Sequence, residues 1–141
     1  MTSSAGLITL DTNIAIYAFT DEGQKADLAA EVIQRAHFVS VQLLNEFANV
    51  TFRKQGLSWH EVSAKITDIR LAVAKILPLD DSANVTALRI AARYQLSFYD
   101  ALMLAVALSG GARTFYSEDM HHDLLIDDTL RVVDPFRAEA S

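Results

Sequence analysis

Short apolar runs alternate with longer stretches in which apolar residues recur at helical spacing. The apolar runs predict strands at residues 7–10, 38–41, 76–79, 114–116 and 130–133. The amphipathic stretches predict helices at about residues 14–19, 25–36, 43–54, 59–75, 82–94 and 98–108. Strands and helices therefore alternate over nearly the whole chain.

Residues typical of element ends support this assignment. Ser58 and Glu61 have the spacing of a capping box at the start of one helix. Asp81 or Ser82 can cap the helix that follows the third strand. Pro78 favours the edge or the end of a sheet for its strand, because proline cannot donate a backbone hydrogen bond.

The order of the elements predicts the fold class. Strands separated by helices need crossover connections, which join parallel strands. We expect an α/β fold with a mainly parallel sheet and helices on both faces, in one domain spanning residues 1–141. In such folds ligands bind beyond the carboxyl ends of the strands.

Composition narrows the function classes. The absence of cysteine excludes disulfides, thiolate metal sites and cysteine nucleophiles. The first residues lack the pattern of a signal peptide, and no run approaches the ~20 apolar residues of a membrane span, so we expect a cytoplasmic protein. The net charge of −6 does not favour a nucleic-acid partner, although cations held by acidic side chains would change the charge locally.

Two acidic residues lie where strands are predicted to end. Asp11 directly follows the strand at 7–10, and Asp119 comes shortly after the strand at 114–116. Taken singly, Asp11 is typical of a helix N-cap and Asp119 of a turn. Because the carboxyl ends of parallel strands meet at one edge of a sheet, both residues can belong to one site.

Two further acids lie on predicted helices. Glu46 lies beside the apolar stripe of the helix at 43–54, where a surface glutamate is the ordinary interpretation. Asp100 lies in the first turn of the strongly apolar helix at 98–108, where the helix dipole favours an acid and Ser97 has capping spacing to it. Each signal is weak alone, and the joint placement of the four acids predicts an acidic site.

Five segments carry a resemblance to a known family. They are residues 10–13 (LDTN), 40–47 (SVQLLNEF), 96–102 (LSFYDAL), 116–120 (YSEDM) and 130–136 (LRVVDPF). In this order and at these intervals, they resemble the PIN-domain family, and specifically the VapC-type toxins of bacterial toxin–antitoxin pairs. The resemblance covers nearly the whole chain.

The resemblance implies an α/β/α sandwich of three layers around a parallel sheet of about five strands. It implies an endoribonuclease that uses Mg²⁺ or Mn²⁺, forms a homodimer and is blocked by a cognate antitoxin. By position, it assigns the acidic site residues to Asp11, Glu46, Asp100 and Asp119. Asn13 and Ser117 match polar positions near the site, and Glu118 competes with Asp119 for the fourth acidic role.

A cluster of carboxylates suits phosphodiester hydrolysis, because hard divalent cations bind oxygen ligands and stabilise charge on phosphate oxygens. A water activated by the cation can attack phosphorus, so we expect no protein nucleophile. Asp11 and Asp100 are the expected central ligands, and Glu46 and Asp119 would complete the set directly or through water. Because like charges repel, some of these acids should have raised pKa values in the absence of metal.

Contacts to an RNA substrate would need basic residues outside this acidic set. Arg53 and Lys54 end the helix at 43–54, and Arg89 and Arg93 lie at helical spacing near residue 90. Each pair is also compatible with an ordinary solvated helix face. All four are therefore candidate phosphate contacts.

Three other functions stay open at this point. A receiver-like signalling module shares the α/β layout and an acidic pocket but usually has a lysine after a late strand, where this chain has Asp134 and Pro135. A phosphohydrolase with an aspartyl nucleophile usually has a second aspartate two residues after the first, where this chain has Asn13. A catalytically inactive interaction module would not need the complete acidic set.

Overall fold

Four strands form the central sheet in the order β1-β4-β6-β5. In the computed structural model, which describes residues 6–137, β1 (Leu7–Leu10), β4 (Ala112–Tyr116) and β6 (Leu130–Val133) are parallel neighbours. At the edge, β5 (Leu125–Ile126) pairs antiparallel with β6. The prediction of a mainly parallel sheet is confirmed.

A second, two-stranded ribbon lies beside β1. It consists of β2 (Val39–Ser40) and β3 (Ile76–Leu77), which are parallel. The Thr9 side chain donates a hydrogen bond to the Phe38 carbonyl at 2.6 Å, which holds the start of the ribbon against β1. Pro78 directly follows β3, which within residues 6–137 pairs with β2 alone. This agrees with the edge or end position predicted for Pro78, because proline cannot donate a hydrogen bond to a neighbouring strand.

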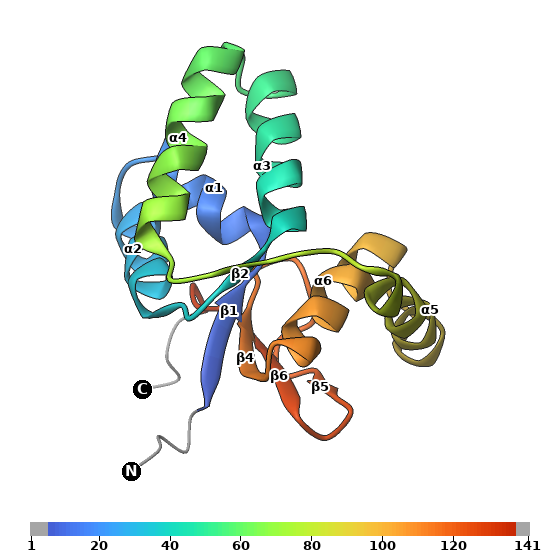
Figure 1. The fold of residues 1–141 in the computed structure, drawn as a ribbon. Coiled ribbons are helices and arrows are strands. Elements are labelled where there is room, and N and C mark those ends of the chain that lie inside the picture. The colour runs from blue at the N-terminus through green and yellow to red at the C-terminus, as the bar shows by residue number, and fades with distance from the viewer. Residues whose placement is uncertain (1–5, 138–141) are drawn as a thin grey trace.

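Six helices surround these strands in the described part of the chain (Figure 1). They are α1 (Thr12–Thr20), α2 (Gln24–Arg35), α3 (Val41–Arg53), α4 (Trp59–Ala72), α5 (Asp81–Tyr94) and α6 (Phe98–Ser109). In Figure 1, α2 lies to the left of the strands and α5 and α6 to the right, α1 lies above β1, and α3 and α4 form a pair that projects upward. Successive residues of a strand face opposite sides of the sheet, and both Thr9 and Leu10 are buried, so β1 is covered on both faces.

The most apolar segment of the sequence forms the helix at the centre of the core. In α6, every residue from Ala101 to Ala107 is buried. The helix starts at Ser97, whose side chain accepts a hydrogen bond from the Asp100 backbone N–H. Within residues 6–137 no helix is both long and apolar enough to cross a membrane.

The structure corrects several predicted boundaries. Val41 already belongs to α3, so the strand predicted at 38–41 is shorter. The cap of α5 is Asp80, whose carboxylate accepts from the Ala83 N–H at 2.8 Å, and not Asp81 or Ser82. The Ser58–Glu61 capping box is confirmed, with both side chain to backbone hydrogen bonds present.

The strand β5 was not predicted from the sequence. It has two residues and returns to β6 through Asp127 and Asp128, which both have positive φ angles of 51° and 55°. Tight hairpin turns usually place Asn-Gly or Asp-Gly at such positions, and two aspartates give no comparable signal. The Arg89 guanidinium holds this turn by donating to both Asp127 carboxylate oxygens at 3.0 and 2.7 Å.

Gly110, at the end of α6, packs closely against Phe38 and Leu77 at the two-stranded ribbon. A Cβ at this position would lie 2.5 Å from a ring carbon of Phe38 and 2.6 Å from a methyl carbon of Leu77. Gly110→Ala should therefore lower the free energy of unfolding by about 1–3 kcal/mol, because overpacking outweighs the ~0.4–1 kcal/mol that replacing glycine usually gains. Urea unfolding measures the change. The neighbouring Ser109→Ala is the control, and equal stability of the two variants would contradict the packing argument.

Candidate functional site

The ends of β1 and β4 bring two of the predicted acids to the same edge of the sheet. Asp11 follows β1 directly, and its backbone N–H donates to the carbonyl of Tyr116, the last residue of β4, at 2.8 Å. Asp119 lies three residues after this strand end. The parallel pairing of β1 and β4 therefore joins segments that are more than a hundred residues apart in the chain.

Asp11 is both a helix cap and a buried carboxylate. Only 5% of its surface is exposed. One carboxylate oxygen accepts from the Thr12 N–H at 2.8 Å, and the other accepts from the Ser117 hydroxyl at 2.8 Å. The two interpretations of Asp11 from the sequence are thus compatible, since the capping contact uses one oxygen.

Burial raises the pKa of Asp11 from 3.8 to about 7. The hydrogen bonds from Ser117 and Thr12 lower this pKa, whereas the negative charges of Asp100 and Glu46 raise it further. A raised pKa among the acids was expected from repulsion between carboxylates. The structure gives a different order of causes, because desolvation is the largest and repulsion contributes less.

Glu46 reaches the same site from the second turn of α3. Its Oε1 accepts from the Thr12 hydroxyl at 2.7 Å, and its Oε2 accepts from Gln42 Nε2 at 3.3 Å. Thr12 and Gln42 were not selected from the sequence. Gln42 could have been found, because it lies four residues before Glu46 and therefore on the same helix face.

The four acids line one pocket of about 430 Å³. Asp100 enters it from the first turn of α6, where Ser97 caps the helix. Within residues 6–137, none of the four carboxylates is in an ion pair with a basic side chain. The predicted residues are therefore brought together around one pocket, and no ion pair fixes any of their carboxylates within these residues.

Asn13 connects two of these acids across the pocket. Its Nδ2 donates to Asp119 Oδ2 at 3.0 Å and, more weakly, to Asp11 Oδ2 at 3.5 Å. Its Oδ1 accepts from the Glu118 N–H at 3.3 Å. Ser117 is fully buried and accepts from the Asp119 N–H at 3.2 Å while it donates to Asp11.

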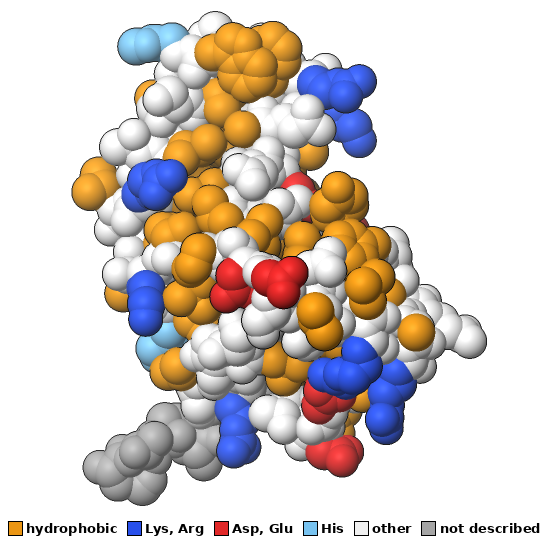
Figure 2. Space-filling view, turned by 45° about the vertical axis from the view of Figure 1, so that its right-hand side comes forward, with side chains coloured by type: hydrophobic (Ala, Val, Ile, Leu, Met, Phe, Trp, Pro, Cys, Tyr) orange, Lys and Arg blue, Asp and Glu red, His pale blue; other side chains and the backbone are white. Residues whose placement is uncertain are grey.

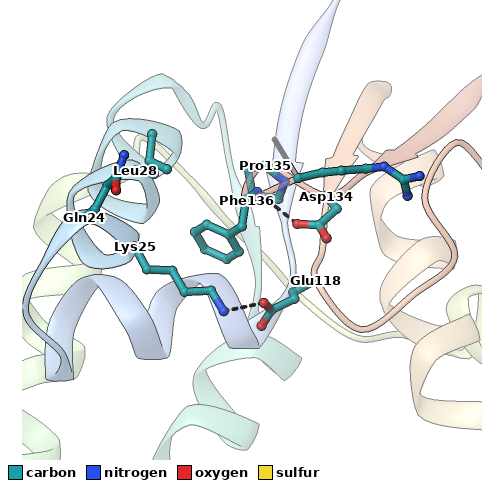
Figure 3. Close-up of a pocket in the computed structure, with 8 residues that line it drawn as sticks. Gln24, Lys25, Leu28, Glu118, Asp134, Pro135 and Phe136 are labelled. Carbon is teal, nitrogen blue, oxygen red and sulfur yellow. Dashed lines mark hydrogen bonds and ion pairs between the residues drawn. The ribbon is translucent and has the colours of Figure 1, made fainter. Parts of the chain in front are cut away.

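Asp119, and not Glu118, lines the acidic pocket. The Glu118 side chain lies in a second pocket, of about 650 Å³, whose wall includes Lys25 and Phe136. There its carboxylate pairs with the Lys25 ammonium (Figure 3) and accepts from the Tyr17 hydroxyl at 2.7 Å. Two adjacent acids that the sequence could not distinguish therefore face different pockets.

The acidic pocket fits a hydrated divalent cation. In the part of the chain that the structure describes, no three His, Asp or Glu side chains stand close enough together to hold an ion by themselves. The donors are instead carboxylate oxygens spread around an open pocket, and within residues 6–137 no basic side chain forms an ion pair with them, although Lys54 also lines the pocket. Mg²⁺ keeps several of its waters when it binds and prefers such oxygens, so the donor set suits it.

The candidate basic residues divide into two groups. Lys54 lines the acidic pocket, and an adjoining pocket of about 400 Å³ is lined by Asn49, Val50, Arg53 and Lys54. Arg89 instead pairs with Asp127 at the β5–β6 turn, and Arg93 lies over the Tyr94 ring at 5.5 Å. Neither Arg89 nor Arg93 lines the acidic pocket, whereas Lys54 lines it and Arg53 lines the adjoining pocket.

Comparison with known proteins agrees with this architecture. The family model of the PIN domain matches residues 8–125. No curated protein matches the chain. A toxin–antitoxin complex from Klebsiella pneumoniae shares the fold with a TM-score of 0.69 and 17% identity, over 92% of this chain and 98% of that chain.

Two further solved structures share the fold. VapC20 from Mycobacterium tuberculosis, described as a toxin that cleaves the sarcin–ricin loop, has a TM-score of 0.63 and 20% identity over 79% of this chain and 91% of that chain. DNA-bound VapBC from Salmonella typhimurium has a TM-score of 0.68 and 17% identity over 92% of this chain and 98% of that chain. At these low identities, the structural similarity establishes a common fold. The family model, in addition, spans most of the sequence. The chain belongs to the PIN-domain family.

Proposed function

We propose that the protein is a metal-dependent endoribonuclease and acts as the VapC-type toxin of a toxin–antitoxin pair. The single observation that carries this proposal is the pocket lined by Asp11, Glu46, Asp100 and Asp119, none of which forms an ion pair with a basic side chain within residues 6–137. Membership of the PIN-domain family and the shared fold with VapC20, a toxin that cleaves the sarcin–ricin loop, support it.

Each acid has a distinct role in this proposal. Asp11 and Asp100 are the central ligands, and Glu46 and Asp119 complete the set directly or through water. Bound there, Mg²⁺ or Mn²⁺ would stabilise charge on the phosphate oxygens and ease deprotonation of the attacking water. The chain's contribution is to fix its ligands, as Thr12 does by donating to Glu46.

Neither phosphoryl-transfer alternative finds specific support. Position 13, where an aspartyl-nucleophile phosphohydrolase would carry a second aspartate, holds an asparagine that hydrogen-bonds to Asp119. The basic residue that lines the pocket, Lys54, ends a helix and does not follow a late strand as in receiver modules.

The proposed contacts to RNA lie at the end of α3. The acidic pocket and the adjoining pocket, which Arg53 also lines, share Asn49, Val50 and Lys54. The two pockets are therefore continuous along this helix. A strand cleaved at the acids would have its neighbouring phosphates within reach of Lys54 and Arg53. We propose these two residues, and not Arg89 or Arg93, as phosphate contacts.

The proposed partners are a cognate antitoxin and a second copy of the chain, in the cytoplasm. The antitoxin is supported by the fold that this chain shares with toxin–antitoxin complexes. The homodimer is supported by exposed apolar side chains on α5 and α6, among them Val85, Leu88 and Tyr99. Figure 2 also shows hydrophobic side chains gathered at the tip of the α3–α4 pair, where the Phe52 and Trp59 rings stack at 3.8 Å.

The direct test is to incubate the purified protein with total RNA in Mg²⁺, Mn²⁺ or EDTA, and to sequence the new RNA ends. Cleavage that needs a divalent cation is the expected result. Intact RNA in both metals, with release of phosphate from small phosphomonoesters, would instead favour the phosphohydrolase.

Asp100→Asn should abolish cleavage. Replacing a carboxylate ligand by an amide should reduce the rate of RNA cleavage by more than about 100-fold, since even residues that only orient metal ligands cost 10–100-fold. The variant should also bind Mn²⁺ more weakly in calorimetry. Asp68→Asn, at an exposed position on α4, is the matched control. Cleavage by Asp100→Asn at the wild-type rate would exclude Asp100 from the site.

Asp11→Asn should stabilise the metal-free protein at pH 8 but not at pH 4. Asp11 has a folded pKa of about 7 and an ordinary value of 3.8, so the native state binds the proton more tightly. The contribution of this group to stability is therefore lost as the pH rises from about 4 to 7, by a few kcal/mol. The amide keeps a hydrogen-bond partner for Ser117 without the buried charge.

Urea unfolding in EDTA at several pH values measures this effect as the difference between wild type and Asp11→Asn. The comparison cancels the titration of carboxylates that do not interact with Asp11. Excess Mn²⁺ should reverse the order of the two proteins at pH 8, because the cation stabilises only the wild-type site. If the stability difference between wild type and Asp11→Asn did not change with pH, ionisation of Asp11 would not destabilise the folded protein.

Lys54→Gln should reduce the salt dependence of RNA binding. Loss of one phosphate contact on a single strand lowers the slope of log K against log salt by about 0.7. Fluorescence anisotropy with a labelled RNA and the catalytically blocked Asp100→Asn background would measure the slope. Arg70→Gln, on the exposed side of α4, is the control and should keep the slope of its parent. An equal slope for both substitutions would remove Lys54 from the RNA path.

A further inference from the structure

Asp119 differs from the other three acids, because it lies on a loop and not in a helix or directly before one. It is exposed, and its carboxylate accepts a hydrogen bond from a single side chain, that of Asn13. By contrast, Asp11 is buried and Glu46 accepts two hydrogen bonds. The orientation of Asp119 therefore depends on the backbone of residues 117–120, which connects β4 to the rest of the chain.

The residue that anchors this backbone on its outer side is Glu118. Its carboxylate is held by two elements from the other end of the sequence, because Tyr17 of α1 donates to it at 2.7 Å and Lys25 of α2 pairs with it. The Lys25 ammonium also donates to the Tyr17 hydroxyl at 3.1 Å. Glu118 thus fixes the loop to α1 and α2 on the side opposite to the acidic pocket.

Lys25 is held by more than its ion pair. Its ammonium lies 4.4 Å from the centre of the Tyr17 ring and 4.9 Å from the centre of the Phe136 ring, and these rings meet edge to face. Figure 3 shows the Lys25 side chain extended between Phe136 and Glu118. An isolated surface ion pair restrains little, whereas a cation bound by a carboxylate, a hydroxyl and two ring faces joins four segments of the chain.

We propose that Lys25 is a positioning residue for Asp119. By holding Glu118 against α1 and α2, Lys25 keeps residues 117–120 in the conformation in which Asp119 faces Asp11 across the acidic pocket. This inference rests on the proposed function, since it assigns Asp119 to the metal site. It adds a residue that touches neither the metal nor the RNA and acts through the adjacent backbone.

The sign of one measurement separates this role from a simple charge effect. If Lys25 acted only as a positive charge near the site, Lys25→Met would remove repulsion and tighten the binding of a cation. If Lys25 positions Asp119, the same variant loses an oriented ligand and binds the cation more weakly. We expect the dissociation constant for Mn²⁺ to rise about tenfold, at the low end of the effects of residues that orient metal ligands.

The experiment uses the full chain and two measurements that need no activity. Calorimetry with Mn²⁺ alone gives the affinity of wild type, Lys25→Met and Lys25→Arg. Hydrogen exchange in EDTA follows the amides of Asp119 and Met120, which donate to Ser117 Oγ at 3.2 and 3.3 Å. In Lys25→Met these amides should exchange faster, and the protein should bind Mn²⁺ more weakly. Lys25→Arg should keep the wild-type exchange rate and Mn²⁺ affinity, because a guanidinium can pair with Glu118 and stack on the rings.

Asp127→Asn is the matched control, because it breaks a different ion pair, that of Asp127 with Arg89. The two side chains of this pair are about as exposed as those of Lys25 and Glu118. This variant should leave both measurements unchanged. If Lys25→Met unfolds, Tyr17→Phe removes one hydrogen bond to Glu118 and should shift both measurements in the same direction by less.

Unchanged exchange together with equal or tighter Mn²⁺ binding in Lys25→Met would overturn the proposal. If wild type neither binds Mn²⁺ nor cuts RNA, the proposed function fails instead. The hydrogen exchange comparison then still decides whether Lys25 fixes the loop, because it is made without metal.

Discussion

The carboxylate of Asp11 is the group on which the rest of the site depends. Burial favours its protonated form, and the acids around the pocket favour that form further. Two neutral donors, the Ser117 hydroxyl and the Thr12 N–H, stabilise the ionised form but do not offset the loss of water. A divalent cation bound at this pocket, as we propose, would favour the ionised form.

The parallel sheet is what makes this arrangement possible. Because β1 and β4 run in the same direction as neighbours, their carboxyl ends deliver Asp11 and Ser117 to one place. The second turn of α3 and the first turn of α6 then bring Glu46 and Asp100 to the same pocket. The acids come from segments far apart in sequence, so only the complete fold forms the site.

The site is not equally rigid throughout. Asp11 lies in the core, where packing and two hydrogen bonds fix it, whereas Asp119 lies at the rim on a loop. The loop is held from both sides, by Asn13 towards the pocket and by Lys25 through Glu118 on the other side. In our proposal, these outer contacts help to orient Asp119 at the rim of the pocket.

The sequence by itself determined the order of the elements apart from β5, and it predicted the four acids that the fold brings to one pocket. Local signals were sufficient for this, since helical and strand periodicity, the Ser58–Glu61 capping box and the apolar run of α6 depend on residues a few positions apart. The acids could be placed at strand ends and first turns because those positions follow from the elements. Their family resemblance added the ordering of the motifs.

Only the tertiary structure decided how side chains beyond this local range are oriented. Glu118 and Asp119 are adjacent and chemically alike, and contacts with α1 and α2 determine which one faces the acidic pocket. Arg89 is likewise assigned to Asp127 by a turn nearly forty residues away. The cause of the raised pKa of Asp11 also required the fold, because desolvation depends on everything packed around the group.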